Sequence, residues 1–188
     1  MDLVARAKGL ILDPQAEWRA IALEPTGPAF LLARYVAVLA VIPALCGLIG
    51  SLILGSPILP SILPSILFAA VSYVLTVVAV CAEAVLIDAL APMFGGQRNF
   101  SNAFKLAAYF PTAYWFAAIF FAIPMLSVLV LLGLYSFYLL RVGLPVLMRV
   151  PPEQAVACTA SAGIGALIFA AIGLTIAARV SGVALWVF

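Results

Sequence analysis

Residues 106–140 read LAAYFPTAYWFAAIFFAIPMLSVLVLLGLYSFYLL, a block of 35 residues without a charged side chain. As one helix at 1.5 Å per residue, this block would be about 52 Å long. The hydrocarbon core of a bilayer is about 30 Å thick and takes about 20 helical residues. The block is therefore too long for one membrane crossing and slightly short for two. We predict two spanning helices that meet in a tight turn at Pro124.

The charges at the two ends of this block favour two crossings. Arg98 and Lys105 precede it, and Arg141 and Arg149 follow it. Lys and Arg concentrate in the loops on the cytoplasmic side of a membrane, so we expect both ends of the block on that side. An even number of crossings then lies between them.

The rest of the chain is also suited to lipid. Of its 188 residues, 67% are hydrophobic and 9% are charged, and its mean hydropathy is +1.29. A soluble domain has about 25% charged residues. We therefore predict an all-α integral membrane protein, a five-helix transmembrane bundle, with an N-terminal segment 1–28 and a membrane domain 29–188. The predicted spans cover about 30–54, 62–90, 104–123, 125–147 and 156–178.

The distribution of positive charge predicts the orientation. Eight of the nine Lys and Arg residues lie on the side of the N-terminus, and Arg179 alone lies on the other side. This bias predicts a multi-pass protein of the cell (inner) membrane with a cytoplasmic N-terminus and a periplasmic C-terminus. Trp186, in the short tail after the last span, is expected to anchor at the outer interface.

The N-terminal segment is predicted to form two short amphipathic helices in the membrane interface. The apolar face of the first is expected to hold Leu3, Val4, Ala7, Leu10 and Ile11, with Arg6 elsewhere on the helix. Asp13 is the expected N-cap of the second helix, and Pro14 its first residue. Trp18 is expected to anchor this helix at the headgroup level. A plain cytoplasmic tail is the alternative.

Four charged side chains lie within or beside the predicted spans, near the cytoplasmic boundary: Arg34, Glu83, Asp88 and Arg141. Ionisable residues inside a membrane are costly, and they pair with one another or line a polar cavity. These four residues are therefore the candidate polar cluster. Placement of Glu83 at the inner interface and of Asp88 in water is preferred over a buried network of these residues.

The third predicted span contains a short polar and aromatic stretch. A kink is expected at Pro111, and Tyr109, Thr112 and Tyr114 lie around it. These side chains either line a small polar pocket or form part of an aromatic girdle at the interface.

Several classes of function receive no support from the composition. The chain contains no histidine, and Cys46, Cys81 and Cys158 are isolated from one another. We therefore expect no metal site, no cofactor and no catalytic residues, and so no enzyme. The formal net charge of +2 comes from scattered residues, so nucleic acid is not expected as a partner.

Small residues recur along the first and last predicted spans, at Gly47, Ser51 and Gly55 and at Ala162, Ala166, Ala170, Gly173 and Ala177. Such faces let membrane helices approach one another closely. Packing within the chain is the preferred interpretation, and a homo-oligomer is the alternative.

Two stretches of the chain resemble the Yip family of Ypt/Rab-interacting, five-span integral membrane proteins, in its bacterial branch. They are DPQAEW at Asp13–Trp18 and LIDALAPMFGGQRNFSNAFKLAAYFPTAYW at Leu86–Trp115. The second contains a D-x-L-A-P-x-F-G-G turn and a K-L-x-A-Y-x-x-T-A-Y-W entry to the third span. The residues that carry the resemblance are Asp13, Pro14, Trp18, Asp88, Pro92, Gly95, Gly96, Lys105, Tyr109 and Pro111.

The resemblance implies an integral membrane protein whose eukaryotic relatives bind Rab-type GTPases and organise Golgi membranes. Those relatives have a D-L-Y-G-P-like segment before the first span, where this chain has LEPTGP at residues 23–28. Rab binding is therefore not carried over to this chain.

Two classes of function remain. The first is a non-enzymatic scaffold or adaptor that contacts the bilayer and an unknown membrane or cytoplasmic protein, and acts in membrane organisation or protein trafficking. The second is a small transporter or channel that uses the candidate polar cluster. The first is preferred, because no constellation of residues resembles a substrate site.

Overall fold

The computed structural model describes residues 3–54 and 62–182, which form helices and no strand. Five of its helical stretches are long and apolar enough to cross a membrane: Pro28–Leu52, Ile62–Phe94, Phe100–Ala122, Met125–Met148 and Pro152–Ser181. The prediction of an all-α, five-span bundle is confirmed, and each predicted span ends within four residues of the observed one. The predicted anchor Trp186 lies outside the described residues. So do residues 55–61, which join the first two spans and include Gly55.

The first, second and fifth spans are built mainly from α-helix. The first consists of α3 (Pro28–Leu31), the π-helix η1 (Leu32–Val36), α4 (Ala37–Leu39) and α5 (Val41–Leu54). The second consists of α6 (Ile62–Leu90) and the 3-10 helix η2 (Ala91–Phe94), and the fifth is α10 (Pro152–Ser181).

The third and fourth spans contain the charge-free block and use 3-10 helix near their shared turn. They consist of α7 (Phe100–Tyr109), α8 (Thr112–Ala117), η3 (Ala118–Ala122), η4 (Pro124–Leu134) and α9 (Tyr135–Met148). The helix breaks before Pro111, as expected, and the extended residue Ile123 makes the turn. A 3-10 helix rises about 2.0 Å per residue instead of 1.5 Å. The 3-10 geometry therefore lengthens both spans, which explains how a block slightly short for two crossings makes them.

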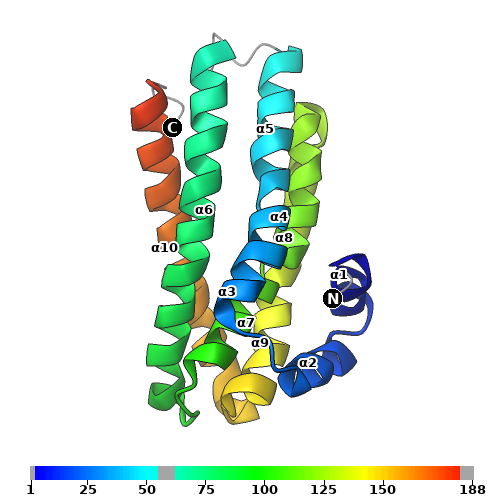
Figure 1. Ribbon diagram of the computed structural model, residues 1–188, viewed down its shortest axis with the longest axis vertical. Coiled ribbons are helices and arrows are strands. Elements are labelled where there is room, and N and C mark those ends of the chain that lie inside the picture. The colour runs from blue at the N-terminus through cyan, green and yellow to red at the C-terminus, as the bar shows by residue number, and fades with distance from the viewer. Residues whose placement is uncertain (1–2, 55–61, 183–188) are drawn as a thin grey trace.

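The N-terminal helices lie beside the spans at one end of the bundle (Figure 1). They are α1 (Leu3–Leu12) and α2 (Pro14–Leu23), and with the flanking residue Glu24 we call them the N-terminal module. The Tyr135 hydroxyl donates a hydrogen bond to the Ile11 carbonyl over 3.2 Å. Tyr135 is about 20 Å along α9 from its C-terminal end at Met148. The module therefore packs against the side of the bundle, at what we call the module end.

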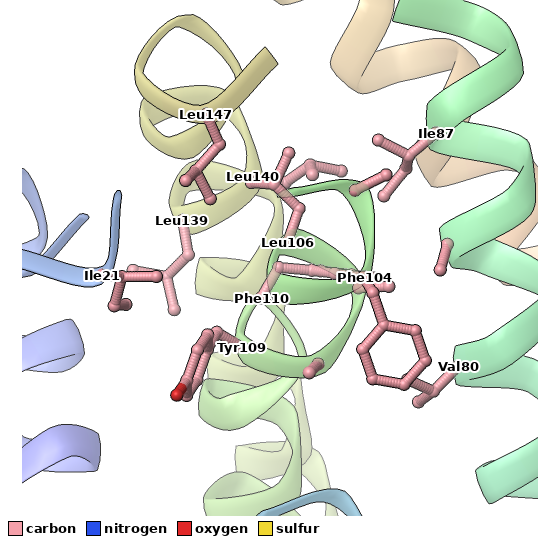
Figure 2. Close-up of a cluster of buried hydrophobic side chains, with 14 of the residues drawn as sticks. Ile21, Val80, Ile87, Phe104, Leu106, Tyr109, Phe110, Leu139, Leu140 and Leu147 are labelled. Carbon is pink, nitrogen blue, oxygen red and sulfur yellow. The ribbon is translucent and has the colours of Figure 1, made fainter. Parts of the chain in front are cut away.

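Most buried side chains are found at the module end, around α7. Figure 2 shows Leu106 of α7 and Phe110, which follows this helix, between α9 on one side and α6 on the other, with Ile21 of α2 nearby. In the most apolar window of the third span, 67% of the residues are buried, whereas no other span exceeds 28%. The third span is therefore the central helix, and the other four present most of their apolar surface to lipid.

Glycine and alanine allow close packing at some of the expected positions only. A Cβ at Gly47 would have nothing within 4 Å, whereas one at Gly50 would overlap the Phe121 carbonyl. On α10, Ala162 is buried but Ala170 is exposed. The close approach of the first span to the third therefore depends on Gly50.

The topology predicts opposite accessibility for two exposed positions. Arg98 lies in the loop between α6 and α7, and Arg179 lies in the last turn of α10. In a background without the three native cysteines, we expect Arg179→Cys to react with a membrane-impermeant maleimide in intact cells. Arg98→Cys should react only after permeabilisation, because an odd number of spans separates the two positions. Labelling of Arg98→Cys in intact cells would contradict the predicted orientation.

Candidate functional site

Trp18 is the centre of the contact between the N-terminal module and the bundle. Its side chain has no exposed surface, and its ring meets the ring of Tyr109 edge-on, with 6.2 Å between centroids. A Cβ at Gly143 of α9 would come within 2.8 Å of the indole, so the absence of a side chain there makes room for it. Trp18 was expected to face the headgroups, but its ring is enclosed by protein, because α7 and α9 provide an apolar and aromatic pocket.

The second module helix begins as the sequence predicts, and a residue of the central span caps its end. Asp13 accepts a hydrogen bond from the Ala16 amide over 3.2 Å, and Pro14 is the first helical residue. At the other end, Lys105 Nζ donates to the carbonyls of Ile21 and Glu24, over 3.1 and 2.6 Å. Carbonyls at a helix C-terminus have no partner within the helix and carry partial negative charge. Lys105 therefore binds α7 to α2.

Lys105 is buried although it lies near the end of a span. A lysine at such a position ordinarily extends along the span toward water, but Lys105 is only 4% exposed. The reason is tertiary: the end of α2 covers this part of α7 and supplies two carbonyl acceptors inside the protein.

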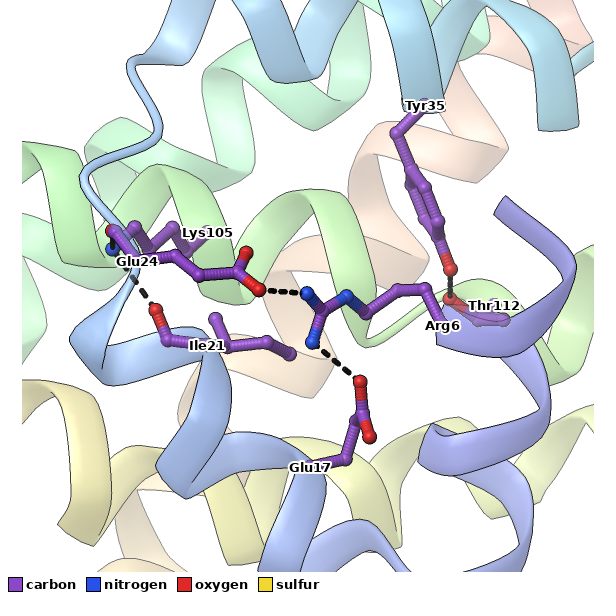
Figure 3. Close-up of polar contacts among 7 residues, drawn as sticks. All are labelled: Arg6, Glu17, Ile21, Glu24, Tyr35, Lys105 and Thr112. Carbon is purple, nitrogen blue, oxygen red and sulfur yellow. Dashed lines mark hydrogen bonds and ion pairs between the residues drawn. The ribbon is translucent and has the colours of Figure 1, made fainter. Parts of the chain in front are cut away.

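Arg6 joins the two module helices to each other and to α7 (Figure 3). Its guanidinium forms ion pairs with Glu17 and Glu24, and it lies over the Tyr109 ring, 5.9 Å from the centroid. Burial opposes the charge of Arg6, but the hydrogen bond and charge of Glu24, with Tyr109 and Glu17, outweigh burial and raise its pKa. With Lys105, the contact contains two positive and two negative side chains and is electrically balanced.

A short chain of hydroxyl groups continues from this contact into the bundle. Thr112 donates to the Tyr109 carbonyl over 2.5 Å, and its Oγ1 lies 2.8 Å from the Tyr35 hydroxyl. Because the carbonyl can only accept, Tyr35 donates to Thr112. Tyr35 belongs to the π-helix η1, and its ring packs against that of Tyr109, 4.6 Å between centroids. The structure thus buries Tyr109 and Thr112 inside the protein, while Tyr114 is 38% exposed.

The ion pairs of Arg6 with Glu17 and Glu24, and the buried hydroxyl of Tyr35, were not predicted from the sequence. Arg6 was expected on a face away from the apolar residues of α1. A signal was present, because Leu3, Arg6 and Leu10 share one helical face by their spacing of three and four residues. In the structure Leu10 is buried, while Val4 is 75% exposed. The buried face of α1 is therefore rotated from the predicted one.

The two glycines of the resemblance lie in a tight turn after η2. Gly95 has φ of +75°, which a residue with a side chain rarely adopts. Gly96 has ordinary φ, but a Cβ there would come within 2.7 Å of the Val150 side chain and 2.8 Å of the Met148 carbonyl. The first glycine is needed for the turn, and the second for close contact with the loop before α10.

Hydrogen bonds join these two loops. The Gln97 amide donates to the Met148 carbonyl over 2.8 Å, and Asn102 Nδ2 donates to the Leu147 carbonyl over 2.9 Å. Arg149 Nη1 donates to Gln97 Oε1 over 3.1 Å. The loop after the second span and the first turn of α7 therefore provide donors for the last carbonyls of α9, which have no partner within their own helix.

The structure does not assemble the candidate polar cluster. Arg34 and Arg141 are exposed, Asp88 is half-buried and Glu83 is 3% exposed. Glu83 and Asp88 are five residues apart on α6, which places them about 140° apart around the helix. The two ion pairs found in the described part of the chain both belong to Arg6, and neither involves these four residues. The residues that the structure does bring together are those of the module contact.

The site binds one segment of the chain to another. Each of its cations contacts oxygen atoms of the protein. Within residues 3–54 and 62–182, no group of three His, Cys, Asp or Glu side chains is arranged to hold a metal ion.

A comparison with models of known families finds a match to the model described as the Yip1 domain, over residues 8–174. Both stretches that carry the resemblance lie within the matched residues. None of the curated proteins and none of the solved structures compared with the chain matches it significantly.

Removal of the Trp18 ring is expected to release the N-terminal module. Trp18→Ala leaves a large cavity between α2, α7 and α9, and truncation of a buried aromatic residue costs about 3–5 kcal/mol. We expect a lower midpoint of thermal unfolding in detergent and faster proteolysis of residues 3–24 in membranes. The matched control is Leu23→Ala on the same helix, where the side chain is 86% exposed. Equal effects of the two variants would show that the module is not docked through Trp18.

Addition of one methyl group at Gly96 is expected to separate the two loops. Gly96→Ala introduces a Cβ into contacts that cannot move freely, and such overpacking costs about 1–3 kcal/mol. Gly47→Ala is the matched control, because the same methyl group meets nothing within 4 Å and alanine favours a helix over glycine. Thermal unfolding of both variants in detergent measures the difference. A Gly96→Ala protein as stable as Gly47→Ala would disprove the close contact.

Proposed function

The chain belongs to the Yip1 domain family, and from this premise we propose that it is a non-enzymatic membrane scaffold or adaptor. In this function the five spans hold the N-terminal module in a fixed position at one face of the membrane, and the module binds a membrane or cytoplasmic protein. The membrane is proposed to be the inner membrane of a bacterial cell, with the module on its cytoplasmic side.

One observation carries the proposal: the module is docked through Trp18 and its charged residues, and its outer surface stays exposed. Arg6 forms ion pairs with Glu17 and Glu24, and Lys105 holds the end of α2. This contact contains both ion pairs found among the described residues, and it serves to position a helix. A fixed helix on the side of a membrane bundle is what a binding surface requires.

The outer surface of the module has two parts with different chemistry. On α1 the exposed residues include Val4, Ile11 and Leu12, which suits contact with lipid beside the spans. On α2 the exposed residues include Gln15 and Arg19, which suits a polar protein surface. We assign the lipid contact to α1 and the partner to α2.

Transport is the second candidate function, and one residue favours it. Glu83 is an acid buried within a spanning helix, and such residues often mark the path of an ion or proton. Uptake measurements with the purified protein in proteoliposomes test this candidate, and Glu83→Gln would abolish uptake if the residue were part of a path.

Crosslinking in native membranes tests the adaptor function. A photoreactive amino acid placed at Gln15 or Arg19 of α2 should yield the same discrete protein adduct, identified by mass spectrometry. At Leu174 of α10, which is also exposed, the same amino acid should react with lipid only. The α2 adduct should disappear in the Trp18→Ala variant, because the module is then no longer held in place. Absence of a protein adduct at both α2 positions would refute the adaptor function.

A further inference from the structure

Glu83 is the one acid of the spans that the described protein buries almost completely. Its side chain is 3% exposed, and neither carboxyl oxygen has a hydrogen-bond partner among the described residues. Two other charged side chains that are largely buried do have partners. Arg6 has two carboxylate partners, and Lys105 has two carbonyl acceptors. An ionised carboxylate without a partner is very unfavourable in an apolar interior.

The carboxyl group of Glu83 faces α10, where that helix comes close to α6. A Cβ at Gly165 would overlap Leu86 and would lie 3.6 Å from Glu83 Oε2. The glycine therefore brings the backbone of α10 next to the acid. The backbone N–H groups inside a helix are already used in i to i−4 hydrogen bonds, whereas each carbonyl keeps a second lone pair. This surface of α10 offers acceptors and no free donors, so it suits a protonated acid better than a carboxylate.

The charged and titratable groups of the neighbouring helices do not neutralise Glu83. On α7, Lys105 is held by the end of α2, and Tyr109 lies in the module contact. On η1, Arg34 is exposed, and Tyr35 is bound to Thr112. On α10, Glu153 is exposed, and Cys158 is a buried thiol two turns before Gly165. None of these groups forms a hydrogen bond or ion pair with Glu83 in the described part of the chain.

We propose that Glu83 is a proton-binding site of the membrane domain. At neutral pH its carboxyl group carries a proton, and loss of that proton weakens the packing of α6 against α10. A proton is the ligand that fits, because it needs one oxygen atom. A metal cation needs several oxygen ligands, and no such group surrounds Glu83 among the described residues. This site is independent of the proposed adaptor function, since it lies in a different contact of the bundle.

The first test is chemical labelling of the intact protein in lipid vesicles. N,N′-dicyclohexylcarbodiimide is an apolar reagent that modifies protonated carboxyl groups in membranes and does not modify carboxylates. We expect mass spectrometry to locate the label on Glu83 at neutral pH, with less label at higher pH. Glu83→Gln is the control and should lose this label, because it has no carboxyl group at this position. A folded protein that is not labelled at Glu83 at neutral pH would overturn the proposal.

The second test measures how the proton on Glu83 affects the packing of α6 against α10. If only the folded state keeps the proton of Glu83, stability is lost as the pH rises above the ordinary pKa of a glutamate, about 4.3, because the unfolded chain then releases this proton. We expect the midpoint of thermal unfolding of the wild type to fall more between about pH 5 and about pH 7 than that of Glu83→Gln, whose amide does not titrate. Equal pH profiles of the two proteins, with Asp88→Asn measured as a control for general charge effects, would refute the coupling of this proton to the contact between α6 and α10.

Discussion

The structure depends on one constraint: a positive charge on the central, most buried span must find its partners inside the protein. Lys105 occurs on α7, which is surrounded by other helices, and the end of α2 supplies two carbonyl groups for it. This contact requires the N-terminal module to lie against the side of the bundle. Once the module is there, Arg6 is also removed from water, and Glu17 and Glu24 provide its counter-charges. The module thus supplies the acceptors for the charge of the central span and the counter-charges for its own Arg6.

Several residues that carry the resemblance have structural roles at the module end of the molecule. Trp18 and Tyr109 pack together, Gly95 makes a turn with positive φ, and Gly96 allows contact with the loop before α10. All of these roles fix the position of loops and of the module relative to the spans. A scaffold for binding needs the same property, because a surface that moves freely loses conformational entropy when it binds. This relation between rigidity and binding is the physical basis of the proposed adaptor function.

The two ends of the bundle differ in how they are stabilised. At the module end, aromatic and aliphatic side chains are packed around α7. Toward the other end, α5, η4 and the second half of α10 present many apolar side chains outward, where lipid surrounds them. Glu83 lies at the contact of α6 and α10, and its carboxyl group has no hydrogen-bond partner among the described residues. A change in its charge would act on this contact and leave the charges of the module unchanged.

The sequence by itself determined the number of spans, their approximate ends and the all-α class, because the cost of unpaired backbone and charge in lipid acts on every residue of a segment. It also predicted the Asp13 cap and the break at Pro111, which depend on neighbours in the chain. The tertiary structure alone decided that Lys105 is buried, that Trp18 is enclosed by protein and that Glu83 lies apart from Arg34 and Arg141. Each of these outcomes depends on which helix covers a given face. The helical period shows that two residues share a face, but the partner of that face comes from a distant part of the chain.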